Sequence, residues 1–228
     1  MQKACRWIST RLKSIFLRAR SLCFLIHSLF IFIGFGFYEW VWWIKRDFGD
    51  PSPAIIKRLL LRRIGGRGIW IESGTFKGET TEFLSSFSKM VYSIEPSSEL
   101  FARAVNKFSK FTNVEIIHGL SEDCLSGVQN KLTSEQVKDV SFWLDGHYSE
   151  GITFRGPSDT PILAELEIIS SNIRRFTQVS VFVDDVRCFD PSQRIYASYP
   201  SKDELVYWAN RHNLNWMIEH DIFIAKNY

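Results

Sequence analysis

The chain has 228 residues, a formal net charge of +3, and many aromatic residues, including 8 Trp and 19 Phe. This length holds one domain with a sizeable core plus an N-terminal extension. The small net charge is not that of a nucleic-acid-binding protein, so we expect no nucleic-acid partner. The 4 cysteines form no C-x-x-C pair, which argues against a disulfide framework or a zinc site. We expect reduced thiols in a cytoplasmic protein.

Residues 1–49 form a basic and apolar segment. An apolar run from Leu22 to Tyr38 lies between two groups of Lys and Arg residues, and its length is at the lower limit for a bilayer span. The aromatic residues at its end are Tyr38, Trp40, Trp42 and Trp43, as is typical of a membrane interface. We expect residues 22–44 to form an apolar helix that contacts the inner face of a membrane. The sequence leaves open an alternative, in which this helix packs on the following domain or on a second copy of the chain in a homo-oligomer.

A second region, residues 50–228, begins at Asp50-Pro51-Ser52-Pro53, where two prolines stop a helix. Beyond this point, short apolar runs alternate with segments of helical periodicity. The expected strands are residues 69–73, 91–95, 114–118, 140–144, 179–183, 214–220 and 221–225. The expected helices are residues 54–63, 80–88, 98–108, 161–174 and 201–211. This order predicts an α/β fold with a Rossmann-like, open, mostly parallel seven-stranded sheet and a C-terminal antiparallel hairpin, with ligands at the carboxyl ends of the strands.

A glycine turn follows the first expected strand, where Ile69-Trp70-Ile71 runs into an acid-x-Gly-x-x-x-Gly sequence. Its candidate ligand-binding residues are Glu72, Gly74, Thr75 and Gly78. Glycine lets a ligand approach the backbone, and the helix that follows offers unpaired N–H donors. The second strand ends in Glu95, where a ribose diol would be held. Together these features predict an adenosine-containing cofactor, although an ordinary strand-turn-helix with a surface acid is the alternative.

Three aspartates end two later strands. Asp145 follows the strand at 140–144, and Asp184 and Asp185 follow the strand at 179–183. Three neighbouring carboxylates repel one another unless a cation lies between them, and hard oxygen ligands suit Mg²⁺ or a similar divalent cation. The alternative is a set of capping or structural aspartates. His147 lies close by and has the unperturbed pKa of a general base, although a structural or metal-binding role stays open.

With these motifs, the chain resembles the class I S-adenosylmethionine-dependent methyltransferases, and in particular the metal-dependent sugar O-methyltransferases of the macrocin type. The resemblance implies that S-adenosylmethionine binds at Glu72, Gly74, Thr75, Gly78 and Glu95, with Ser121 and Glu122 beside the adenine. It also implies that Asp145, Asp184 and Asp185 hold Mg²⁺ and that Asp145 or His147 takes the proton of the acceptor. The acceptor implied is a hydroxyl of a sugar, a glycoconjugate or another small molecule. His147 departs from the pattern, because the family often has an aspartate there.

The segment from Gly146 to Asp159 contains three glycines and one proline, and we expect it to be a substrate loop or lid. A plain surface loop fits the same residues. Two other functions remain as alternatives. An NAD-dependent oxidoreductase is disfavoured by the missing G-x-G-x-x-G and Tyr-x-x-x-Lys motifs. A membrane-tethered, non-catalytic binding protein on a methyltransferase fold is the second.

Overall fold

The computed structural model describes residues 39–145 and 160–228. The chain divides into two compact units, Met1–Gly49 and Asp50–Tyr228. In the first unit, a helix covers residues 39–45, and the Trp43 ring meets Trp40 and Phe48 edge-on. Most of the segment expected to contact a membrane, residues 22–44, lies outside the described residues. Among the helices that are described, none has the length and apolar character needed to cross a bilayer.

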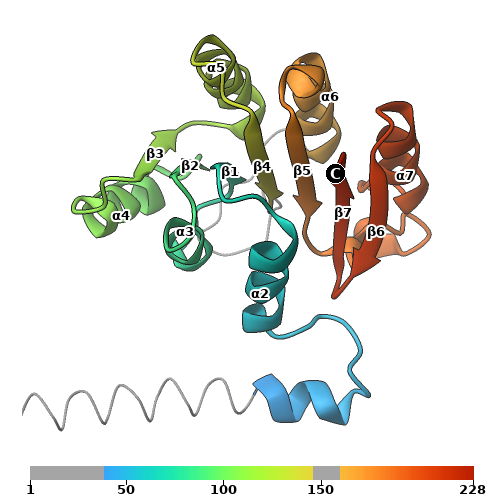
Figure 1. Cartoon of the computed structure of the whole chain (residues 1–228). Helices are drawn as coiled ribbons and strands as arrows, with labels where there is room; N and C mark the ends of the chain where they lie inside the picture. Colours follow the sequence, from blue (N-terminus) through green and yellow to red (C-terminus); the bar gives the residue numbers. More distant parts are fainter. Residues whose placement is uncertain (1–38, 146–159) are drawn as a thin grey trace, which may run out of the picture. The chain divides into compact units, whose positions relative to one another are not determined.

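The second unit is built on a seven-stranded sheet with the order β3-β2-β1-β4-β5-β7-β6 (Figure 1). The strands are β1 (Ile69–Ser73), β2 (Met90–Glu95), β3 (Val114–His118), β4 (Asp139–Leu144), β5 (Gln178–Val183), β6 (Asn215–Glu219) and β7 (Ile222–Lys226). The first five strands are parallel, and β7 lies antiparallel between β5 and β6. The predicted α/β sheet with its C-terminal antiparallel hairpin is confirmed.

Helices cover both faces of this sheet. They are α2 (Ala54–Ile64), α3 (Glu79–Ser85), α4 (Ser98–Phe108), α5 (Ser121–Ser134), α6 (Ile162–Asn172) and α7 (Lys202–Arg211), with short 3₁₀ turns after α6 and β5. The side chains of a strand alternate between the two faces, so Ile71 packs in the core under α5, α6 and α7. Trp70 packs with Leu61 of α2 and Leu84 of α3 in the opposite core. Figure 1 shows α5, α6 and α7 on one side and α2 and α3 on the other.

Helix α5 was not among the elements expected from the sequence. Its N-cap is Leu120, and the serine that usually signals a helix start is instead the first helical residue, Ser121. Its buried face nevertheless has helical spacing, with Leu125, Val128 and Leu132 in the core. Helix α3 is also shorter than the expected 80–88, because the chain turns away after Ser85.

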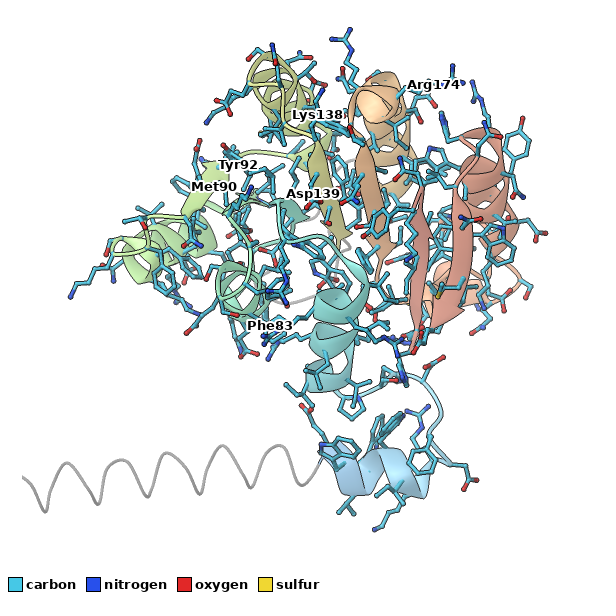
Figure 2. The ribbon with its side chains drawn as sticks, viewed as in Figure 1. Phe83, Met90, Tyr92, Lys138, Asp139 and Arg174 are labelled. Atoms are coloured by element: carbon cyan, nitrogen blue, oxygen red, sulfur yellow. The ribbon has the colours of Figure 1, made fainter. Side chains whose placement is uncertain are left out.

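The C-terminal hairpin turns at His220 and Asp221, whose φ angles are 53° and 65°. Two positive φ angles in a two-residue loop are typical of the type I′ turn that matches the twist of paired strands. The expected strand at 221–225 therefore began one residue too early. Because β7 runs antiparallel to β5, this turn lies at the carboxyl end of β5. Met90 and Asp139, the first residues of β2 and β4, lie at the amino ends of the strands (Figure 2).

Candidate active site

The carboxyl ends of the parallel strands bring the predicted site residues to one edge of the sheet. Ser73 of β1 is level with Ile94 of β2 and with Leu144 of β4, which in turn is level with Val183 of β5. The residues that follow these positions are Gly74, Glu95, Asp145 and Asp184. The strand order reverses at β1, which pairs with β2 on one side and β4 on the other. Open α/β sheets bind their ligands at this type of switch point.

The glycine turn is tied to the end of β2. The backbone N–H groups of Gly74 and Thr75 donate to the Ile94 carbonyl oxygen over 3.0 and 3.3 Å. The Thr75 hydroxyl also lies 2.6 Å from the Ser93 hydroxyl. Gly74 has a φ of 87°, a value that favours glycine. The turn is therefore held in place by the neighbouring strand.

Gly78 is required for packing. It caps α3 with a φ of 68°, and a Cβ atom there would lie 2.6 Å from the Phe108 ring. Both observations account for glycine at this position without a bound ligand. A contact between Gly78 and a cofactor stays a prediction.

Glu95 joins the glycine turn to the start of α4. Its two carboxylate oxygens accept hydrogen bonds from the backbone N–H groups of Phe76, over 2.8 Å, and Ser97, over 2.9 Å. A carboxylate has further lone pairs, so Glu95 can also accept from a diol. The structure thus places Glu95 at the edge of the sheet where a ribose was expected.

Glu72 lies beneath the turn, with only 1% of its surface exposed. One carboxyl oxygen accepts hydrogen bonds from the hydroxyls of Thr81 and Ser93, each over 2.6 Å. Burial raises the pKa of Glu72 to about 7, against the lowering effect of these two hydroxyls. Glu72 therefore links β1, β2 and α3, and its contact with a cofactor stays a prediction.

The three predicted metal ligands come together. Asp145, Asp184 and Asp185 each offer a carboxylate oxygen, and these oxygens lie within 4.8 Å of one another. The chain leaves β5 in a left-handed conformation, with a φ of 53° at Asp185. This turn lets two neighbouring aspartates reach the same place. Burial, together with the charge of Asp145, raises the pKa of Asp184 to about 7.

Lys57 and Asp221 join this cluster, although neither was predicted. The Lys57 ammonium lies 2.5 Å from Asp184 Oδ1, 2.9 Å from Asp185 Oδ1 and 3.8 Å from Asp221 Oδ2. Burial lowers the pKa of Lys57, but the carboxylates of Asp184 and Asp185 outweigh this, so its pKa is raised. The guanidinium group of Arg187 pairs with both Asp185 and Asp221. The aspartates are thus partly neutralised by side chains of the protein.

The donor set fits a divalent cation. All the candidate ligand atoms are carboxylate oxygens, the type that Mg²⁺ prefers. Among the described residues, the four carboxylates of Asp145, Asp184, Asp185 and Asp221 outnumber the two cations Lys57 and Arg187, leaving a formal charge of two negatives. The Lys57 ammonium already contacts Asp184 and Asp185, so an ion would share their oxygens with it.

Glu165, on α6, is a further buried carboxyl that the sequence reasoning missed. It has no exposed surface, and neither carboxyl oxygen has a hydrogen-bond partner among the residues that the structure describes. Burial raises the pKa of Glu165 to about 7. The nearby hydroxyls of Ser121 and Ser73 partly oppose this rise, although neither forms a hydrogen bond with the carboxyl group. The Ser121 hydroxyl lies 3.3 Å from Glu122 Oε2 instead. The expected adenine-side residues Ser121 and Glu122 therefore lie close to Glu165.

A cavity of about 190 Å³ opens beside the aspartates, between α2, α3 and the ends of β4 and β5. Its lining residues are Ser52, Ala54, Lys57, Arg58, Leu61, Thr80, Trp143, Asp145 and Asp184. Two of them, Asp145 and Asp184, also belong to the candidate metal site. His147 and the rest of the expected substrate loop, residues 146–159, lie outside the described residues.

Solved structures with a similar arrangement include several methyltransferases. The N-methyltransferase NodS from Bradyrhizobium japonicum WM9, in complex with S-adenosyl-L-homocysteine, has 13% identity and a TM-score of 0.49, over 78% of this chain and 88% of that one. An rRNA methylase from Streptococcus thermophilus has 15% identity and a TM-score of 0.44, over 78% of this chain and 96% of that one. A SAM-dependent methyltransferase from Aquifex aeolicus has 14% identity and a TM-score of 0.46, over 77% and 93%.

No protein-family model matches the chain, and no curated protein matches it by sequence.

Proposed function

We propose that the protein is an S-adenosylmethionine-dependent methyltransferase that methylates a hydroxyl group. The observation that carries the proposal is the meeting of Glu95, at the end of β2, with Asp145 and the Asp184–Asp185 pair at one edge of the sheet. A carboxylate at the end of β2 suits a ribose diol. The acidic cluster lies at the ends of β4 and β5, two and three strands away from β2 and on the other side of β1, where an acceptor would approach.

In this proposal the cofactor lies across the switch point. Glu95 accepts hydrogen bonds from the ribose, and Ser121 and Glu122, at the start of α5, face the adenine. Gly74 and Thr75 form the turn beneath it. When bound, S-adenosylmethionine supplies a methyl group on a positively charged sulfur. Alignment of the acceptor with this methyl group matters more than added charge, because the charges of nucleophile and sulfonium cancel in the reaction.

Asp145, Asp184 and Asp185 would hold Mg²⁺ or a similar cation, which acidifies a hydroxyl bound next to it. Either Asp145 or His147 then removes the acceptor proton. Lys57 keeps Asp184 and Asp185 in place through its short contacts with both. A sugar, a glycoconjugate or another small molecule with a hydroxyl is the acceptor that this site suits.

Calorimetric titration of the full chain tests the cofactor. We expect S-adenosylhomocysteine to bind, NAD not to bind, and the Glu95→Gln variant to bind S-adenosylhomocysteine about tenfold more weakly, because a neutral amide is a poorer acceptor for the diol. Binding of NAD alone would support the oxidoreductase alternative. Binding of neither ligand would support a non-catalytic binding protein.

The N-terminal segment supports a second, independent part of the proposal, namely that residues 22–44 attach the protein to the cytoplasmic face of a membrane. This part depends on the apolar run and its aromatic end. Carbonate extraction of membranes from the native source tests it: recovery wholly in the soluble fraction rules out integral attachment.

A further inference from the structure

The cavity beside the aspartates is lined by two residues whose buried N–H donors have no acceptor among the described residues. Its volume of about 190 Å³ exceeds the roughly 150 Å³ of an engineered cavity that binds benzene. It therefore has room for a group about the size of a six-membered ring. The two donors are Trp143, on β4, and Arg58, on α2.

Trp143 is 3% exposed, and its indole N–H has no hydrogen-bond partner in the part of the chain that the structure describes. An indole can only donate, so it needs an acceptor from elsewhere. A buried N–H without an acceptor costs free energy, and a phenylalanine would fill most of the same space without this cost. The indole N–H therefore indicates a ligand atom that accepts a hydrogen bond.

Arg58 shows the same pattern. Its Nη2 donates to Glu79 Oε2 over 2.6 Å, which fixes one edge of the guanidinium group. Its Nε atom is buried and has no partner within residues 39–145 and 160–228. Arginine N–H groups bind carboxylates and phosphates more strongly than neutral acceptors. A positively charged donor and a neutral donor thus line one cavity from two different elements.

We propose that Arg58 and Trp143 bind an anionic oxygen group, a carboxylate or a phosphate, in this cavity. Asp145 and Asp184 line the same cavity, so the ligand would carry its anion toward Arg58 and Trp143 and a cationic or hydroxyl group toward the aspartates. Two sources have this chemistry. One is the amino-acid carboxylate of the cofactor, which depends on the proposed function, and the other is an acidic group on the acceptor.

Two ligands separate these sources, because S-adenosylhomocysteine carries the amino-acid end and 5′-methylthioadenosine lacks it. Calorimetry would compare the wild type with Arg58→Gln and Trp143→Phe. The matched controls are Arg62→Gln, also on α2 but outside the cavity, and Trp208→Phe, whose indole N–H already has partners. If the cofactor is the source, both test variants bind S-adenosylhomocysteine about tenfold more weakly or worse and bind 5′-methylthioadenosine like the wild type.

The indole N–H signal of Trp143 gives a second readout in a nitrogen-15 NMR spectrum, assigned through Trp143→Phe. For the cofactor source, S-adenosylhomocysteine shifts this signal and 5′-methylthioadenosine does not. The acceptor is the source if three results are found together. Inorganic phosphate or succinate shifts the signal, Arg58→Gln removes that shift, and neither variant changes the affinity for S-adenosylhomocysteine. The proposal is overturned if all these ligands leave the signal unmoved and both variants bind S-adenosylhomocysteine normally.

A different result is expected if the protein is not a methyltransferase. In that case the wild type does not bind S-adenosylhomocysteine at all, while the response of the Trp143 signal to phosphate and succinate still decides whether the cavity binds anions.

Discussion

The ammonium group of Lys57 lies 2.5 Å from a carboxylate oxygen of Asp184, although the two residues are 127 positions apart in the chain. This ion pair joins α2 to the end of β5 inside the acidic cluster. Both side chains are close to nine-tenths buried, so solvent screens the pair only weakly. The contact makes α2 part of the site.

Replacing Lys57 with Met removes the cation that contacts the buried carboxylate of Asp184 and leaves Asp185 paired with Arg187 alone among the described residues. We expect a loss of about 3–5 kcal/mol in the free energy of unfolding, the usual cost of removing one partner of a buried pair. Urea denaturation at pH 8 in EDTA measures this loss. Mg²⁺ should raise the melting temperature of the variant more than that of the wild type, because the ion replaces the missing charge. Equal stability of variant and wild type in EDTA would contradict the prediction.

Replacing both Asp184 and Asp185 with Asn removes two of the three predicted metal ligands. We expect the double variant to lose saturable binding of Mn²⁺, used as a probe for Mg²⁺, because an amide oxygen is a weaker ligand than a carboxylate. Electron paramagnetic resonance of free Mn²⁺ measures this binding without an acceptor substrate. Asp190→Asn, at a half-buried position outside the cluster, is the matched control. Undiminished Mn²⁺ binding in the double variant would exclude these two ligands.

Glu165 should make the stability depend on pH. Its pKa is raised to about 7 in the folded chain, so the folded state holds a proton that the unfolded state has lost. The wild type should therefore lose stability relative to Glu165→Gln as the pH rises from about 4.5 to about 7. Between pH 4 and pH 8 the difference should shift by about 3 kcal/mol in favour of the variant.

Urea denaturation of the wild type and Glu165→Gln at pH 5 and pH 8 measures this difference. Glu167→Gln, at an exposed position of the same helix, removes the same charge and serves as the control. A stability difference that does not change with pH would show that Glu165 is ionised in the folded protein.

Gly78 and Gly127 should respond in opposite ways to an added methyl group. Gly78→Ala forces a positive φ on alanine and brings its Cβ against the Phe108 ring, so we expect a loss of about 1–3 kcal/mol. Gly127→Ala adds a methyl group to an exposed position of α5 with no atom within 4 Å, and should gain up to about 1 kcal/mol. Thermal unfolding measures both changes, and a neutral Gly78→Ala would show that the turn relaxes easily.

The sequence predicted the sheet and the acidic edge because both depend on local patterns. Apolar runs that end in Glu95, Asp145 and Asp184 indicate parallel strands, and parallel strands place such residues at one edge. Lys57 could not be found in this way. It belongs to a helix far from the aspartates in the chain, and only the packing of α2 brings its ammonium group to them.

Asp221 lies between these two cases. The C-terminal hairpin was expected from the sequence, but its expected boundary assigned Asp221 to a strand, and no position near β5 was inferred for this residue. The unpaired N–H of Trp143 has no signal in the sequence, because a tryptophan that ends an apolar strand usually serves only the core. Whether a polar atom has a hydrogen-bond partner depends on side-chain positions, which the sequence pattern does not specify.

The two-residue turn at His220 and Asp221 connects the C-terminal hairpin with the acidic cluster. Asp221 is bonded to Arg187 and lies near Lys57, so fraying of the hairpin would withdraw one negative charge from both cations at once. Lys57 and Arg187 would then bind the remaining aspartates more strongly and compete better against an incoming ion. Loosening of the hairpin would thereby change the electrostatic potential at the acidic cluster.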